Sequence, residues 1–464
     1  MHRLLPFFLV FGLLAGPALR ANEPAQWLAR SGAENFPGVA FAVVENGETT
    51  RLETAGELEL GAGEPIAAET PFLVGSISKS FTALAIMQLV EAGKVDLDAP
   101  LSRYLPRFAG KPSGRVTIHR LLNHTSGFAT AQGNATQTDL AEDDEALARR
   151  VDGLLAIDPA DPPGSTHRYS NANYQLLGRI VETVSGQSYA EYVEQNILAP
   201  AGMEDSFVHP SPRSVQLAQG HRPWFGGFRA LEANLTGAGS APQGGIAASA
   251  RDMALYLSLM MNGEDDILSA EGKARMVRSD DPAAPEYGYG WAIDRETGRV
   301  WHAGANAGYD AMVAMLPEQG KGAVVLLNAG SGLAFGRTGD LRLGLTSAAL
   351  GLEEPPAADA TPFQVVFVIL CILPFLFVFG IYRAWRKRRR ERRKGAVPAL
   401  RLWVPVFMAF ALAWGLAVGL PGTFGTGLGA TMLFVPDFGL LLAASAAAAV
   451  AWALARIVFR PRAQ

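Results

Sequence analysis

Cysteine is almost absent from this sequence, because Cys371 is the only one among 464 residues. A single thiol cannot form a disulfide within the chain, and it cannot build a thiolate metal site. The seven histidines are scattered, and none has the spacing of a zinc-binding helix. We therefore expect no metal site.

Several motifs of nucleotide-dependent and other enzymes are also missing. The sequence has no Gly-rich phosphate loop followed by Lys-Ser/Thr, no dinucleotide fingerprint, no Gly-x-Ser-x-Gly nucleophile elbow and no internal repeat. These absences remove several enzyme classes, and together with the lack of metal ligands they predict a chain that works without a cofactor.

Positive charge is scarce over most of the chain. Residues 362–464 hold 13 basic and 2 acidic side chains and residues 1–21 hold two basic ones, which leaves 25 basic and 42 acidic residues over 22–361. That region has a net charge near −17, although the whole chain is at −4. An acidic surface repels phosphate backbones, so we expect no nucleic-acid partner.

Long apolar runs are concentrated at the two ends. Residues 1–21 carry Arg3, then an apolar stretch, then small residues, which is typical of a secretory signal peptide. Three further runs cover 363–382, 402–420 and 438–455, and each is long enough for a membrane span of about 20 residues. Residues 353–361 are rich in Pro and Ala, which predicts a linker between the domain that precedes them and these spans.

The basic residues predict the orientation of the spans. Residues 383–401 contain ten Lys or Arg against one acid, Glu391, and three more arginines follow the last span. Positive loops stay cytoplasmic. We therefore predict a multi-pass protein of the cytoplasmic membrane with residues 22–352 as a domain on its outer face. The sequence does not identify a protein partner.

The pattern of residues 22–352 predicts an α/β fold. Gly38–Val44 and Thr49–Thr54 flank Asn46-Gly47 and predict a hairpin, and Ser78–Glu91 is apolar on nearly all sides, as in a buried helix. Residues 101–240 read as an inserted α domain with its best helices at 174–185 and 189–197. A helix at 250–261 precedes strands expected at 287–293, 299–302, 311–316 and 323–327. Strands at both ends of the domain imply one sheet built from distant segments.

The first candidate for chemistry is Ser76-Ile77-Ser78-Lys79, where a hydroxyl and an amine three positions apart project from one helix face. Serine is a weak nucleophile until a base takes its proton, and lysine can be that base if burial lowers its pKa from about 10.4. Taken alone, the same residues fit a helix N-cap followed by a surface lysine.

Two further motifs accompany it: Tyr169-Ser170-Asn171 before a helix, and His302-Ala303-Gly304 at the end of a strand. In this order and spacing, Ser-x-x-Lys, Tyr-x-Asn and His-x-Gly resemble class C β-lactamases, low-molecular-weight penicillin-binding proteins and related serine esterases. Residues 121–127 and 244–253 also resemble short sequence motifs of that family. The resemblance implies an antiparallel sheet flanked by helices with an inserted α domain, here followed by three spans.

The resemblance also implies roles for particular residues. Ser76 would attack a carbonyl to form an acyl-enzyme, and Lys79 and Tyr169 would share its proton. The backbone amides of Ser76 and Ala305 would form an oxyanion hole next to Gly304, and Asn171 would orient the acyl side chain and hold Lys79. The substrate would be a small molecule or a peptide.

One position departs from the β-lactamases of that family, which carry Lys where this chain has His302. Histidine is largely neutral above about pH 6.5, so it is a weaker anchor for an antibiotic carboxylate. Ester or amide hydrolysis, on a cell-wall peptide or D-amino-acid substrate, is therefore preferred over β-lactamase activity. A catalytically silent peptide-binding or sensor domain remains the alternative outside the enzymes.

Overall fold

The central sheet brings together the two ends of the N-terminal domain, which comprises the described residues up to 352. The computed structural model describes residues 27–354, 356–390 and 399–459, so the predicted signal peptide lies outside the described residues. Strands β1 (Gly38–Glu45) and β2 (Glu48–Gly56) form the predicted hairpin, and positive φ angles of 51° at Asn46 and 85° at Gly47 make its turn. The hairpin prediction is confirmed.

The other strands of this sheet come from the end of the domain. They are β8 (Ala292–Ile293), β9 (Val300–Asn306), β10 (Tyr309–Leu316) and β11 (Lys321–Leu327). The order is β2-β1-β11-β10-β9-β8, with every neighbouring pair antiparallel. Because β11 pairs directly with β1, the prediction of a sheet assembled from distant segments is confirmed.

One predicted strand is wrong over most of its length. A strand was expected at 287–293, but only Ala292–Ile293 is a strand, and Tyr287 makes an isolated bridge to Ala292. Gly290 has φ +78°, and a Cβ on it would lie 2.7 Å from Ser80 Cα. The backbone bends here to pass close to the helix that follows Ser76, and this bend prevents a continuous strand.

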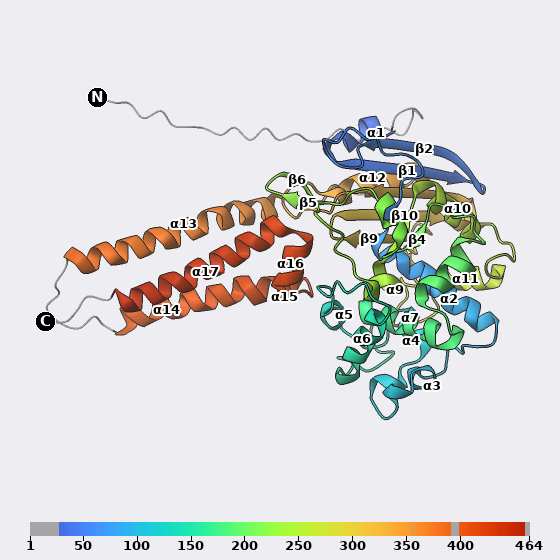
Figure 1. The fold of residues 1–464 in the computed structure, drawn as a ribbon, viewed down its shortest axis with the longest axis horizontal. Helices are drawn as coiled ribbons and strands as arrows, with labels where there is room; N and C mark the ends of the chain where they lie inside the picture. The colour runs from blue at the N-terminus through green and yellow to red at the C-terminus, as the bar shows by residue number, and fades with distance from the viewer. Residues whose placement is uncertain (1–26, 355, 391–398, 460–464) are drawn as a thin grey trace.

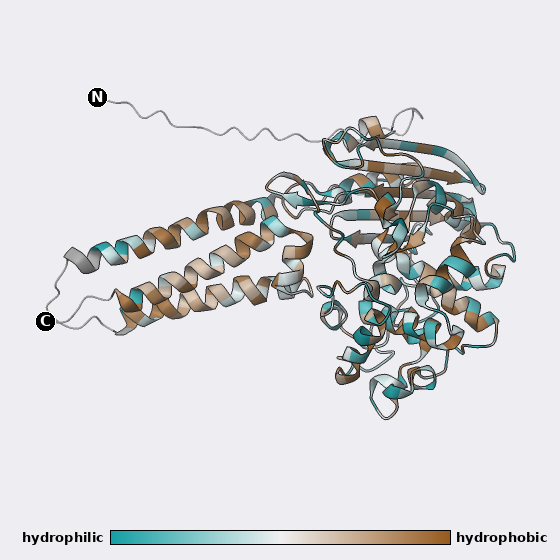
Figure 2. Ribbon diagram, viewed as in Figure 1, coloured by the Kyte–Doolittle hydropathy of each residue, from teal (hydrophilic) through white to brown (hydrophobic). Residues whose placement is uncertain are grey.

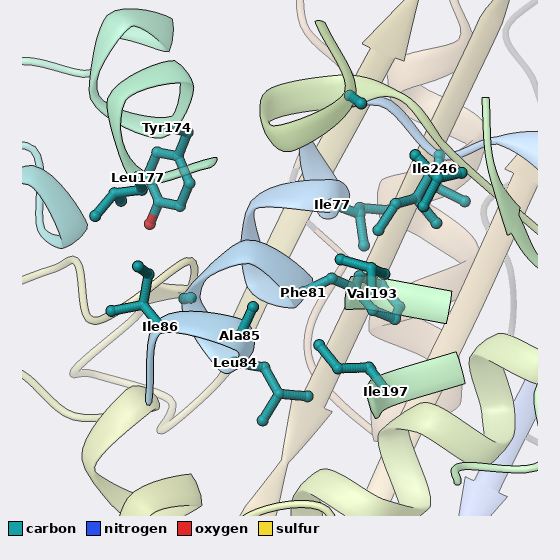
Figure 3. Close-up of a cluster of buried hydrophobic side chains, with 14 of the residues drawn as sticks. Ile77, Phe81, Leu84, Ala85, Ile86, Tyr174, Leu177, Val193, Ile197 and Ile246 are labelled. Carbon is teal, nitrogen blue, oxygen red and sulfur yellow. The ribbon is translucent and has the colours of Figure 1, made fainter. Parts of the chain in front are cut away.

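The helix α2 (Ser78–Glu91) lies at the centre of the main core, as its apolar sequence predicts. Phe81, Leu84 and Ile86 are fully buried. Figure 3 shows α2 side chains among residues of other elements, with Tyr174 and Leu177 approaching from α7. Both the sheet and the helical region therefore need this helix for their cores.

The sheet uses its two faces for two cores, as strand alternation requires. Ala40 and Ala42 of β1 belong to the core around α2, whereas Val39 and Phe41 belong to a smaller core on the opposite face. Helix α12 (Thr338–Leu350), which the sequence pattern did not single out, covers that second face. The short helix α1 (Trp27–Arg30) joins it there.

Helices dominate the middle of the chain, although the predicted insertion at 101–240 is not purely helical. It contains α3 (Leu101–Tyr104), α4 (Ile118–Leu122), α5 (Thr130–Asn134), α6 (Ala146–Gly153), α7 (Asn171–Ser185) and α8 (Tyr189–Val193). Short strands lie there too: β4 (Phe207–Val208), β5 (His221–Trp224) and β6 (Gly227–Ala230). β4 pairs with β7 (Ile246–Ala248), which also pairs with β3 (Phe72–Leu73), while β5 and β6 form a hairpin.

The remaining α-helices described in the N-terminal domain are α9 (Ala241–Gly244), α10 (Ala250–Met261) and α11 (Ala270–Met276). The bounds of α10 confirm the helix predicted at 250–261.

The C-terminal part forms a separate helical bundle (Figures 1 and 2). It consists of α13 (Thr361–Arg390), α14 (Ala399–Trp414), α15 (Leu420–Thr423), α16 (Leu428–Phe434) and α17 (Pro436–Val458). Three stretches, Thr361–Arg386, Leu400–Thr423 and Pro436–Val458, are long and apolar enough to cross a membrane. They correspond to the three predicted apolar runs.

The bundle is joined to the N-terminal domain at one end. Figure 1 shows α15 and α16 at the end that faces the domain, whereas the ends of α13 and α14 that flank residues 391–398 lie at the other. Phe225 N donates to Asp437 Oδ2 at 3.0 Å, and Asn134 Nδ2 donates to Gly425 O at 3.1 Å. Phe335 also packs with Phe367 of α13. The connection is therefore both polar and apolar.

We expect truncation of the α2 core to destabilise the N-terminal domain strongly. Phe81 is fully buried and stacks on Tyr256 with ring centroids 4.1 Å apart. Phe81→Ala should lower the free energy of unfolding by about 3–5 kcal/mol and lower the midpoint of thermal unfolding of the full chain in detergent. Val215→Ala, at a side chain that is 91% exposed, is the control. Equal midpoints for the two variants would contradict this packing.

Candidate active site

Ser76 lies in a tight turn at the start of α2. The turn is a 3-10 segment, Gly75–Ile77, between β3 and α2, and Gly75 has φ +56°. The N-cap of α2 is Ile77, so Ser76 does not cap the helix. Ser76 is half-buried and lines a cavity of about 540 Å³. Its hydroxyl is thus open to a bound molecule.

Lys79 lies directly behind Ser76. Its Nζ is 3.0 Å from Ser76 Oγ and 2.9 Å from the carbonyl oxygen of Gln243. The side chain is fully buried, and burial lowers its pKa well below the usual value. A neutral amine can donate one N–H to Gln243 and keep its lone pair for the hydroxyl proton of Ser76.

Aromatic rings enclose the amine. Lys79 Nζ is 4.9 Å from the ring centroid of Tyr169 and 5.7 Å from that of Tyr174. Burial raises the pKa of Tyr169, and a hydrogen bond with the Ser76 side chain partly offsets this rise. Tyr169 is therefore a neutral hydroxyl next to both Ser76 and Lys79, which suits it to pass a proton between them and a bound molecule.

Strand β9 approaches the Ser76 turn so closely that only glycine fits. A Cβ on Gly304 would overlap the carbonyl oxygen of Val74 and lie 3.0 Å from Ser76 N. A Cβ on Gly75 would overlap the backbone nitrogen of Ala305. The two backbones thus touch next to the amides of Ser76 and Ala305, and both residues line the cavity.

His302, also on β9, is held in the neutral form. Its Nδ1 lies 2.7 Å from the carbonyl oxygen of Ala303, so Nδ1 carries the proton, and Nε2 accepts from the Tyr287 hydroxyl at 3.0 Å. Burial, together with the positive charge that Lys79 carries when it is protonated at low pH, lowers the pKa of His302 to about 3. The residue therefore supplies no positive charge to the cavity at neutral pH.

Asn171 also lines the cavity, but its contacts differ from those that the resemblance implies. It is the first residue of α7, and its Nδ2 donates to Asn134 Oδ1 at 2.9 Å. Its Oδ1 is buried and has no hydrogen-bond partner among the described residues. Lys79 bonds to the backbone of Gln243 instead.

The cavity is also lined by Asn134, Gln243 and Tyr287, none of which was predicted from the sequence as a site residue. Gln243 immediately precedes the motif that begins with Gly244-Gly245. That neighbouring motif was the only signal in the sequence that could have identified Gln243 as a site residue. Tyr287 was assigned to a strand, and Asn134 begins the glycosylation sequon Asn134-Ala135-Thr136, which gives no signal for a catalytic site. By contrast, the structure brings together the three motifs, which lie far apart in the sequence.

The surrounding loops also fit this arrangement. His124 is fully buried with φ +60°, and its Nδ1 accepts from Ser170 N at 3.2 Å. It therefore holds the backbone next to Tyr169. The site thus contains a hydroxyl next to a buried amine, a second hydroxyl, and two adjacent backbone amides. Serine hydrolases use these groups as nucleophile, base, proton donor and oxyanion hole.

Comparison with known proteins agrees with this geometry. The family model described as Beta-lactamase matches residues 25–347. The chain therefore belongs to the beta-lactamase family of serine hydrolases, and both the resemblance and the fold class expected from it are confirmed.

Individual relatives include penicillin-binding proteins. Penicillin-binding protein 4 of Amycolatopsis lactamdurans is 29% identical over 374 residues, which cover 74% of this chain and 96% of that protein. The octameric penicillin-binding protein homologue from Pyrococcus abyssi has a TM-score of 0.61 at 28% identity, covering 74% of this chain and 80% of that one. The D-amino acid amidase from Ochrobactrum anthropi SV3 shares the fold, with a TM-score of 0.57 at 24% identity over 65% of this chain and 89% of its own.

Gly304→Ala should disable the site without unfolding the domain. The added methyl group would push β9 away from Val74 and Ser76, and loss of one backbone donor to a developing negative charge costs about 100-fold in rate. The measurement is the rate at which a fluorophosphonate labels the full chain. Gly339→Ala, where nothing lies within 4 Å of the new Cβ, is the control. Equal labelling of both variants would contradict the arrangement.

The pH dependence of labelling should follow Lys79. Lowering the pH adds a proton to Lys79 and removes the base, so the rate should fall as the pH falls through a pKa well below about 10.4. Lys79→Arg, whose guanidinium stays protonated, should be inactive across the range. His302, with its pKa near 3, should contribute no inflection around pH 6.5. An inflection there that disappears in His302→Gln would contradict the neutral imidazole.

Proposed function

We propose that this chain is an acyl-enzyme hydrolase of esters or amides, anchored in the cytoplasmic membrane with its catalytic domain on the outer face. The observation that carries the proposal is the 3.0 Å contact between Ser76 Oγ and Lys79 Nζ, an amine with a burial-lowered pKa. A lysine buried only to stabilise the fold would not need to contact a half-exposed hydroxyl at a cavity wall, so this contact favours a role in catalysis.

Acylation uses each group of the site once. Lys79 Nζ takes the proton of Ser76 Oγ, and Oγ forms a bond to the substrate carbonyl carbon. The negative charge on the carbonyl oxygen is stabilised by the backbone N–H groups of Ser76 and Ala305. Tyr169 gives its hydroxyl proton to the leaving group and regains one from Lys79, so that the bond to the leaving group breaks and the acyl-enzyme remains.

Deacylation repeats these steps with water. Lys79 and Tyr169 take a proton from the water as its oxygen attacks the acyl carbon, and Ser76 Oγ leaves with that proton. The carboxylic acid is released and the site returns to its starting state. Asn171, whose Oδ1 is buried without a partner among the described residues, accepts a hydrogen bond from the acyl side chain in this scheme.

The environment of His302 favours some substrates over others. A neutral imidazole, already bonded to Tyr287 and Ala303, offers no fixed charge to a carboxylate. Arg342 also lines the cavity, but its Nη1 is paired with Asp310 Oδ1 at 2.6 Å. These contacts support peptide, amide or ester substrates, including D-amino-acid compounds of the cell wall, over β-lactams.

Placement at the outer face rests on the sequence and on the joined architecture. The loop with α15 and α16 lies at the end of the bundle that contacts the domain, and the ends of α13 and α14 next to the basic segment lie at the opposite end. Positive segments stay in the cytoplasm. This arrangement supports the outer location that the predicted signal peptide also requires.

Intact-mass spectrometry of the full chain in detergent tests the proposal. A fluorophosphonate should add one mass increment to the wild type and none to Ser76→Ala, because only an activated hydroxyl reacts. In parallel, penicillin should acylate slowly or not at all, since His302 is neutral and the charge of Arg342 is paired with Asp310. Labelling that persists in Ser76→Ala would end the assignment of the nucleophile.

The same experiment separates the enzyme from a silent sensor. Ser80, whose Oγ is buried and bonded to Ile77 O at 2.8 Å, provides the matched control Ser80→Ala on the same helix. That variant should label like the wild type. A wild-type chain that resists the reagent while remaining folded would favour a peptide-binding or sensor domain.

A further inference from the structure

The C-terminal bundle supplies part of the cavity wall. Leu433 and Phe434, at the end of α16, line the same cavity as Ser76 and Tyr169. These two side chains lie far along the chain from the nucleophile, between the second and third candidate spans. The cavity is therefore shared between the catalytic domain and the bundle.

Polar contacts hold α16 in this position. Arg222 Nη1 donates to the carbonyl oxygen of Leu433 at 3.3 Å. Asp437, in the first turn of α17, is buried and accepts from Phe225 N at 3.0 Å. Both contacts come from the β5–β6 hairpin, so this hairpin sets the distance between α16 and the catalytic domain.

A third contact connects the loop before α16 with the catalytic residues. Asn134 accepts a hydrogen bond from Asn171 through Oδ1 and donates one to the carbonyl oxygen of Gly425 through Nδ2. Thr130 and Asn134 are the first and last residues of α5. Thr130 lies against Gly425, since a Cβ on Gly425 would be 3.2 Å from Thr130 Cγ2. The loop therefore borders the side of the cavity where Asn171 lies.

The packing around α16 leaves the side chains of Leu433 and Phe434 available to contact a molecule bound in the cavity. Leu428 and Val435 pack against an apolar cluster that includes Phe438 and Leu442 of α17. Leu433 and Phe434 are half-buried and border the cavity instead. They present an apolar surface to whatever the cavity binds, next to polar groups that orient it.

We infer that α16 is part of the substrate-binding site, and that the substrate carries an apolar acyl group that packs against Leu433 and Phe434. The inference rests on the proposed acyl-enzyme function, which places the acyl group next to Asn171. The substrate class is an amphiphilic ester or amide at the membrane surface. The three spans then serve the reaction by holding one wall of the site, in addition to anchoring the chain.

The test compares two p-nitrophenyl alkylphosphonates, one with a methyl and one with a hexyl group on phosphorus, whose alkyl group stands for the acyl group. The full chain is studied in lipid nanodiscs, and the second-order rate of labelling at Ser76 is measured by intact mass. Phe434→Ala should lower the ratio of hexyl to methyl rates about tenfold, as expected for lost apolar contact in a pocket. Phe424→Ala, in the same loop at an exposed side chain, should keep the wild-type ratio.

A second variant guards against a general loss of structure. Phe434→Trp fills the cavity further and should also lower the ratio, by excluding the hexyl chain rather than by removing its contact. Wild-type ratios in both Phe434 variants, or equal losses of both rates, would overturn the inference while leaving the proposed function intact. No labelling of the wild type by either phosphonate would instead contradict the proposed function, and this inference with it.

Discussion

The burial of one amine beside one hydroxyl sets the requirements for the rest of the catalytic domain. An ammonium group is costly to remove from water, so Lys79 stays in the neutral form only where packing excludes solvent on every side. The amine is surrounded by the carbonyl oxygen of Gln243 and by the rings of Tyr169 and Tyr174. Ser76, one turn earlier, reaches the cavity because the chain turns at Gly75.

Much of the fold could be predicted because its signals are local. Asn46-Gly47 demands a turn of positive φ, and the continuous apolar surface of residues 78–91 demands burial. The strand expected from Tyr287 failed for the opposite reason. Its residues have strand-forming character, but the close approach of Gly290 to α2 decides the local conformation, and that contact joins segments that are distant in the sequence. The cover of the second sheet face by α12 likewise depends on tertiary packing.

The residues of the site likewise fall into those that local sequence motifs predict and those that only tertiary contacts bring there. Ser76, Lys79, Tyr169 and His302 belong to short motifs, so the sequence pointed to them. The structure places Ser76, Tyr169 and His302 at one cavity, with the buried amine of Lys79 directly behind Ser76. The carbonyl of Gln243 could not be predicted as the partner of Lys79, because every residue type offers the same backbone oxygen. The apolar wall of α16 was hidden for another reason: within a series of apolar helices, Leu433 and Phe434 look like any other apolar residues.

The position of β11 in the sheet has a consequence for how this domain forms. Val39 pairs with Leu327, so the last strand to be synthesised lies between the first hairpin and β10 rather than at an edge. Contacts of such large sequence separation form slowly, since the closure entropy of the chain must be overcome before they stabilise anything. The sheet cannot close until Leu327 is available, and the first candidate span begins soon afterwards, at Thr361. The first candidate span is therefore synthesised soon after the sheet can be completed. The contacts between α16 and the β5–β6 hairpin can form only later, once residues 428–437 have followed.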